Sequence, residues 1–89
     1  MNRSGTFDGK GKAVAIKSYV LIEVSVGSVS QVVKSLKAIN EVKSANVVTG
    51  SYDVIALVES EDMKMVADLV TVQIQSIHGV TKTITCVAM

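Results

Sequence analysis

The chain has 89 residues, enough for one domain, and 48% of them are hydrophobic, with a mean hydropathy of +0.43. No uncharged apolar run approaches the roughly 20 residues that a membrane-spanning helix needs, so the apolar surplus predicts self-association instead. The formal net charge is +1, and residues 17–89 hold six lysines against seven acidic residues, which disfavours direct binding of nucleic acid through its phosphates. The single cysteine, Cys86, rules out an internal disulfide, and we expect a cytoplasmic protein.

Residues 1–16 are predicted to be a flexible leader ahead of a folded domain over residues 17–89. The first 12 residues contain three glycines and show no hydrophobic periodicity. Basic residues precede an apolar stretch, as in a signal peptide, but Lys17 and Glu23 interrupt that stretch, and it alternates like a strand.

The first predicted elements are a strand over residues 18–26 and a helix behind it. Alternation places Val20, Ile22, Val24 and Val26 on one face of the strand. Ser28 is then expected to cap the helix in a capping box, and the helix carries apolar residues at spacings of three and four.

The second half predicts two strands, a helix and a final strand. Residues 42–49 and 54–59 form the strands, and the second of these lacks clean alternation, which is typical of a strand in the middle of a sheet. Ser60 is expected to cap the next helix, and Gly79 to stop it before a strand over residues 80–89. The helix has an inward stripe and a second apolar stripe that points elsewhere: Met63, Val66, Val70, Ile74 and Ile77 form the first, and Met65, Leu69 and Val72 the second.

The order strand, helix, strand, strand, helix, strand predicts an α+β fold of the ferredoxin-like βαββαβ type. Right-handed crossovers give a four-stranded antiparallel sheet with two helices on one face. The other sheet face and the second helix stripe remain uncovered within one chain. The two apolar surfaces predict a homo-oligomer in which dimers assemble further.

No residue pattern in the chain indicates catalysis, a metal site or a cofactor. His78 stands alone beside Gly79, and Cys86 lies among apolar strand residues, where a free cysteine behaves as a small hydrophobe. The only arginine is Arg3, which excludes the phosphate cradle that acylphosphatase-type catalysis needs. We expect a protein that is not an enzyme.

The turn between the two middle strands, residues 49–53, has two interpretations. In one, Gly50 supplies a positive φ, Asp53 bonds nearby backbone and Tyr52 packs. In the other, successive backbone N–H groups form an anion-binding nest for a carboxylate, and Asp53 accepts from an ammonium group. Such a site would suit an amino acid, which carries both charges on one carbon.

The sequence VVTGSYDVIALV, residues 47–58, resembles the signature of the Lrp/AsnC family, in which a Gly-x-Tyr-Asp turn of the effector-binding RAM domain leads into a central strand. Residues 74–87, IQSIHGVTKTITCV, are similar to the ending of that domain, with matches at Gly79, Val80, Thr83 and Thr85. The resemblance spans residues 17–89.

The resemblance implies that sheet faces pack together in dimers, that dimers join into rings, and that amino-acid effectors bind between dimers near the turn. It assigns ligand binding to Gly50, Tyr52 and Asp53. Further assignments from the last strand and from adjacency are Thr83, Thr85, Thr49, Ser51 and Ser76. The helix-turn-helix that family regulators place ahead of this domain has no counterpart in the leader. The chain therefore resembles stand-alone RAM proteins, or else a truncated regulator.

The hypothesis from sequence is an amino-acid-binding module in transcriptional regulation. It would act through homo-oligomerisation, or through full-length Lrp/AsnC regulators with which it could mix. Two alternatives stay open: a small dimeric enzyme of the α+β-barrel type, and a purely structural oligomerisation module.

Overall fold

A computed structural model describes residues 16–89, so the predicted leader lies outside the described residues except for Ile16. Ile16 already belongs to the first strand. The elements in chain order are β1 (Ile16–Val24), α1 (Val29–Lys37), β2 (Val42–Val47), β3 (Val54–Ser60), α2 (Met63–Asp68), a π-helix η1 (Leu69–Ile74) and β4 (Val80–Val87).

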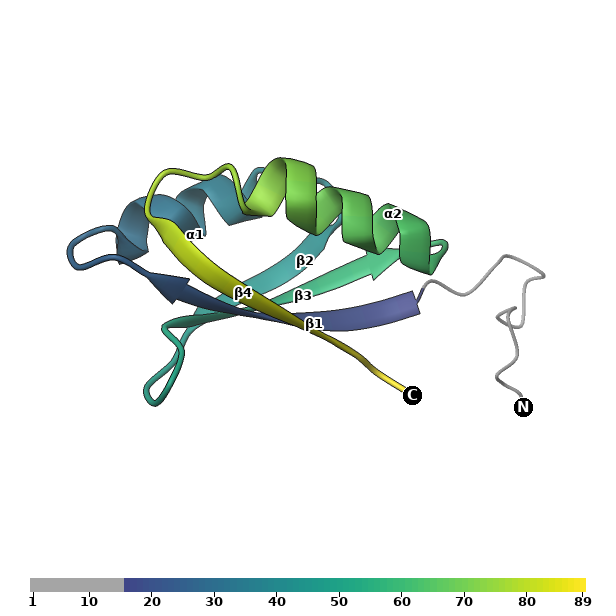
Figure 1. Cartoon of the computed structure of the whole chain (residues 1–89), viewed down its shortest axis with the longest axis horizontal. Helices are drawn as coiled ribbons and strands as arrows, with labels where there is room; N and C mark the ends of the chain where they lie inside the picture. Colours follow the sequence, from purple (N-terminus) through teal and green to yellow (C-terminus); the bar gives the residue numbers. More distant parts are fainter. Residues whose placement is uncertain (1–15) are drawn as a thin grey trace.

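The four strands form one antiparallel sheet in the order β2-β3-β1-β4. Both helices cover the same face of this sheet, and the β2–β3 connection extends past the end of the sheet on the side away from the helices (Figure 1). The predicted ferredoxin-like α+β fold is confirmed. No helix within residues 16–89 is long and apolar enough to cross a membrane.

The core lies between the helices and the sheet, and β1 and β3 supply its floor by strict alternation. Val20 and Ile22 of β1 are fully buried, as are Val54 and Val58 of β3. The sequence of β3 does not alternate cleanly in hydropathy, but its burial alternates along the whole strand. Its predicted central position is correct. The second set of side chains on each strand therefore points to the opposite face.

That opposite face, called here the open face, has no helix of the described chain over it (Figure 1). Direct pairing places Tyr19 beside Leu57 and Cys86, and Leu21 beside Ile55 and Ile84. Tyr19 is 43% exposed and Ile84 is 38% exposed. The open face is defined by the side chains of Tyr19, Leu21, Ile55, Leu57, Ile84 and Cys86.

Three expectations for the first half of the chain are wrong. β1 ends at Val24 and not at Val26, whose side chain is fully exposed in the following turn. Ser28 is the N-cap residue of α1, but its side chain caps nothing, because its hydroxyl lies 3.1 Å from that of Ser25. The capping box is therefore absent. β2 also ends early, at Val47 rather than residue 49.

The second helix differs most from its prediction. Ser60 is the buried last residue of β3, and Asp62 is the N-cap, accepting a hydrogen bond of 2.8 Å from the N–H of Met65. Met63, predicted to face inward, is 45% exposed. From Leu69 the helix continues as a π-helix, and Leu69, which is expected on the outer stripe, is buried. The regular helix period did not predict this change.

Candidate functional site

The residues of the 49–53 turn are tied to the end of β1 through Asp53. The backbone N–H of Asp53 donates to the carbonyl oxygen of Ile22 at 3.0 Å, and its Oδ2 accepts from the N–H of Val24 at 2.8 Å. The carbonyl oxygen of Asp53 accepts from the N–H of Val48 at 2.9 Å, which closes the turn. Asp53 thus bonds a strand 29 residues away, and not merely its own turn.

The tip of the turn leaves its backbone donors free. Within residues 16–89, the N–H groups of residues 49–52 donate to no backbone or side-chain acceptor. Gly50 has a φ of +126°, and no atom lies within 4 Å of where its Cβ would be. Residues with a side chain rarely adopt such a φ, so glycine suits this position. Unpaired backbone amides of successive residues can bind a carboxylate where they converge.

Thr83 lies at the same end of the sheet as the turn. Ile22 of β1 pairs with Val54 on one side and with Thr83 on the other. Two strand spacings therefore separate Thr83 from the start of β3, or roughly 10 Å. The hydroxyl of Thr83 accepts a hydrogen bond of 2.9 Å from the side-chain amide of Gln75. Gln75 and Thr83 line a hollow of about 410 Å³ with Val80, Thr81 and Lys82.

Two further predicted residues lie apart from the turn. The hydroxyl of Ser76 donates to the carbonyl oxygens of Val72 at 2.8 Å and Gln73 at 3.1 Å, so it is turned back onto the helix end. Thr85 lines an apolar hollow of about 270 Å³ between β4 and α2. Gln75, which the sequence analysis did not select, contacts the last strand in place of its neighbour Ser76. In the sequence, only the longer side chain of Gln75 distinguished it from Ser76 as a residue that could reach the last strand.

The turn contributes to none of the hollows described in this chain. The four hollows described for residues 16–89 are lined by none of residues 49–53. Thr49, Gly50 and Ser51 are exposed, whereas Tyr52 and Asp53 are half-buried. An enclosed site there would need a surface from another molecule.

His78 and Cys86 show no catalytic arrangement in the described residues. His78 is exposed in the turn before β4, and the thiol of Cys86 is exposed on the open face opposite Tyr19. No group of three or more His, Cys, Asp or Glu side chains within residues 16–89 is arranged to hold a metal ion.

Residues 17–89 match the family model described as the Lrp/AsnC ligand binding domain. The chain belongs to the Lrp/AsnC family. This Lrp/AsnC domain is therefore a regulatory effector-binding module.

Solved structures similar to the Lrp/AsnC domain fall into two groups by length. TTHA0845 from Thermus thermophilus is 34% identical with a TM-score of 0.80, and the match covers 83% of this chain and 92% of that one. PHS023 from Pyrococcus horikoshii is 31% identical with a TM-score of 0.77, covering 83% and 89%.

The longer relatives share the fold at lower identity. Escherichia coli AsnC is 20% identical with a TM-score of 0.79, and the match covers 83% of this chain but 50% of AsnC. At this identity the likeness shows the fold alone. The comparison with curated protein sequences gave no match.

Proposed function

We propose that this domain binds a free amino acid, or a small effector with the same two charges, at the 49–53 turn where two copies meet. The observation that carries this proposal is that one turn contains both free backbone N–H donors and a carboxylate. The N–H groups of residues 49–52 would hold the effector's carboxylate. The Asp53 carboxylate would hold its ammonium group.

Asp53 can serve both the fold and the effector because its two carboxylate oxygens are separate acceptors. Oδ2 accepts from Val24, whereas Oδ1 receives no hydrogen bond from any residue of 16–89. An ionised carboxylate has room for several donors. The effector's ammonium group would bind Oδ1 without displacing the bond that anchors the turn.

The neighbouring copy would close the site and connect binding to assembly. The open face supplies one apolar surface for dimers, and the outer side of the second helix supplies another, where Met65 is 43% and Val72 is 67% exposed. Buried apolar area drives association. An effector held between dimers stabilises the assembly that contains its complete site, so occupancy and oligomeric state are coupled.

The regulatory output would pass through protein contacts in the cytoplasm, among copies of this chain or with full-length Lrp/AsnC regulators. Residues 17–89 carry a slight excess of acidic residues, which gives no basis for direct DNA contact. One relative of the same fold, NMB0573 from Neisseria meningitidis, was solved as a complex with L-Met and is 18% identical. This supports an amino-acid effector without identifying which one.

The test is isothermal titration of the full chain with each common L-amino acid, with sedimentation velocity at each end point. We expect at least one to bind with a Kd of about 1 mM or tighter and to shift the oligomer distribution. Asp53→Asn keeps an acceptor for Val24 and removes the charge, so it should abolish binding while the fold survives. Ser30→Ala, an exposed change on α1, is the control.

Two outcomes contradict the proposal. If no amino acid binds or shifts assembly, the domain is not an amino-acid sensor. If binding occurs but both Asp53→Asn and Tyr52→Ala leave it unchanged, the effector binds elsewhere. If the assembly persists in all variants and no amino acid binds to any of them, a purely structural module is favoured.

A further inference from the structure

Ser60 is a buried polar residue whose hydroxyl has no partner. Its side chain is 6% exposed, and its Oγ makes no hydrogen bond. Leaving a buried hydroxyl unpaired is unfavourable, and native proteins avoid it unless water or a ligand completes the bond. Ser60 lines two adjoining hollows of about 330 Å³ each, which also share Glu41 and Met65. The unpaired hydroxyl itself has almost no accessible surface, so it lies behind the wall of these hollows, beside Met65.

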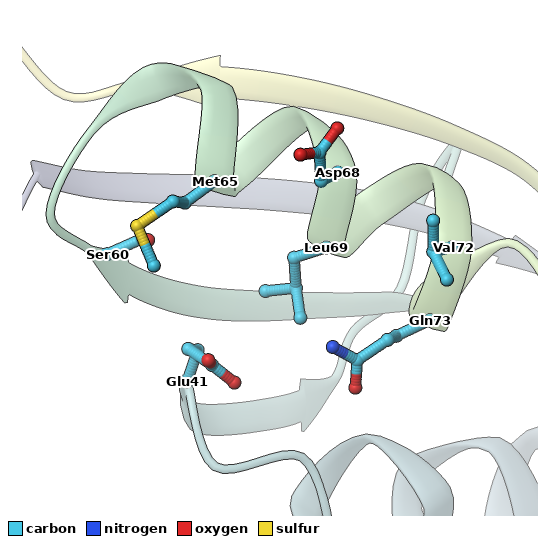
Figure 2. Close-up of a pocket in the computed structure, with 7 residues that line it drawn as sticks. All are labelled: Glu41, Ser60, Met65, Asp68, Leu69, Val72 and Gln73. Atoms are coloured by element: carbon cyan, nitrogen blue, oxygen red, sulfur yellow. The ribbon is translucent and has the colours of Figure 1, made fainter.

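The two hollows form what we call the acidic groove, between the second helix and the turn that precedes β2. Figure 2 shows Glu41 and Gln73 extending toward each other below Leu69, with Ser60 beside the Met65 thioether, whereas Asp68 points away from them. The π-helix carries Leu69 and Gln73. Such widened turns occur often at functional sites. The residues that define the groove are Glu41, Glu59, Ser60, Met65, Asp68 and Gln73.

The charge of the groove selects a cation. Four acidic residues are among those that line the two hollows (Glu41, Glu59, Glu61 and Asp68), against one basic residue, Lys43. The Lys43 Nζ lies 3.4 Å from the carbonyl oxygen of Asn40, and it forms no ion pair with a carboxylate of residues 16–89. Clustered like charges repel one another, and a bound cation relieves that repulsion.

The arrangement of these carboxylates favours an organic cation over a metal ion. They are spread along the groove, and no three acidic, His or Cys side chains of the described residues converge on one point. Leu69, Met65 and Val72 add an apolar wall along one hollow. Methylene groups can pack on such a wall while ammonium groups reach carboxylates at either end.

We propose that the acidic groove binds a linear aliphatic diamine. One ammonium group would donate to Glu41, the Ser60 hydroxyl and the Gln73 amide oxygen. The second would lie in the adjoining hollow, which Glu61 also lines. The Met65 side chain, half-exposed and flexible, moves aside to admit the ligand to Ser60.

This site is separate from the turn of the proposed function and does not depend on it. Val54 begins β3 at the turn, and Ser60 ends the same strand at the groove. Six residue steps of a strand at about 3.3 Å each place the two roughly 20 Å apart. Asp53→Asn should therefore leave diamine binding unchanged, and Ser60→Ala should leave amino-acid binding unchanged. Failure of either proposal is distinguishable from failure of the other.

The test is to titrate the full chain separately with putrescine, with n-butylamine and with magnesium chloride. Calorimetry and the amide chemical shifts of the protein measure binding in each titration. We expect putrescine to bind more tightly than the monoamine and to shift the amides of Glu41, Ser60 and Gln73. Ser60→Ala should weaken binding about three- to tenfold, the effect of one hydrogen bond, and Glu41→Gln by at least as much. Added sodium chloride should weaken it further.

Glu23→Gln is the matched control, because Glu23 is a carboxylate on β1, outside the groove, and its amide counterpart can still accept from Thr81. It should bind putrescine like the parent chain. Equal binding by parent, Ser60→Ala and Glu41→Gln overturns the proposal, as does the absence of binding in the parent chain. Magnesium shifts at the groove without putrescine shifts would make it a metal site and also overturn it.

Discussion

The carboxylate of Asp53 accepts a hydrogen bond of 2.8 Å from the backbone N–H of Val24, where the regular pairing of β1 ends. The β1–β3 ladder stops at the pair Ile22–Val54, and the β1–β4 register shifts between Glu23 and Val24. The N–H of Val24 would lack a ladder partner there. One side chain from the 49–53 turn thus completes the hydrogen bonding of β1.

Removal of that acceptor should destabilise the fold. We expect Asp53→Ala to lower the free energy of unfolding by about 1–3 kcal/mol, because it leaves a part-buried N–H unpaired. Asp53→Asn retains an oxygen acceptor and should cost less than about 1 kcal/mol. Urea unfolding followed by circular dichroism measures both. Equal stability of the alanine variant and the parent would show that the bond contributes nothing.

Gly79 should tolerate no side chain, because α1 approaches it closely. Its φ is +101°, and an added Cβ would lie 2.6 Å from the Cβ of Ser28 and 3.2 Å from a methyl carbon of Val32. We expect Gly79→Ala to cost about 2–5 kcal/mol, the sum of backbone strain and overpacking. Thermal unfolding of the variant measures this cost.

Gly27 supplies the control for Gly79. Its φ is +83°, but no atom lies within 4 Å of an added Cβ. Gly27→Ala should therefore cost only the backbone strain, about 1–2 kcal/mol. Ser28→Gly in the Gly79→Ala background should recover part of the loss, because it removes the clashing carbon. Similar costs at both glycines would contradict the close approach.

Ser18 offers a site for stabilisation. It is fully buried on β1, and its hydroxyl has no hydrogen-bond partner. Ser18→Ala should raise the free energy of unfolding by about 1 kcal/mol, since it removes an unpaired polar group from the core. Ser25→Ala, at an exposed position, should change it by less than about 0.5 kcal/mol. A destabilised Ser18→Ala variant would mean that the hydroxyl has a partner.

The open face and the outer side of the second helix should govern different steps of assembly. Leu21→Glu places a charge at the apolar centre of the open face, and burial of an unpaired charge is unfavourable by several kcal/mol. We expect it to weaken dimerisation at least about 100-fold. Val72→Glu should leave dimers intact and remove larger assemblies.

Sedimentation velocity over a range of concentrations separates these two effects. Ser30→Glu on α1 introduces the same charge at an exposed position and should not change sedimentation. If Leu21→Glu sediments like the parent chain, the open face is not the dimer interface. A monomeric Val72→Glu variant would assign dimerisation to the helix instead.

The sequence by itself determined the order of elements, the ferredoxin-like fold and the family. In β1, Val20, Ile22 and Val24 recur with a period of two, which shows the face of the strand that meets the core. In α1, the buried residues recur at helical spacing, which shows the face of the helix that meets the core. Gly50 was correctly predicted to have a positive φ. These features depend on neighbours in the chain, which a sequence displays directly.

Only the tertiary structure decided which polar groups meet. The bond from Val24 to Asp53 joins residues 29 apart, and the proximity of Gly79 to Ser28 depends on how α1 packs. The helix becomes a π-helix over Leu69–Ile74, where the N–H of Gln75 donates to the carbonyl oxygen of Val70, five residues earlier, and no regular period anticipates this change. The acidic groove likewise brings Glu41, Ser60 and Gln73 together from three separate elements. Such contacts arise from the packing of distant segments, and local sequence carries no signal for them.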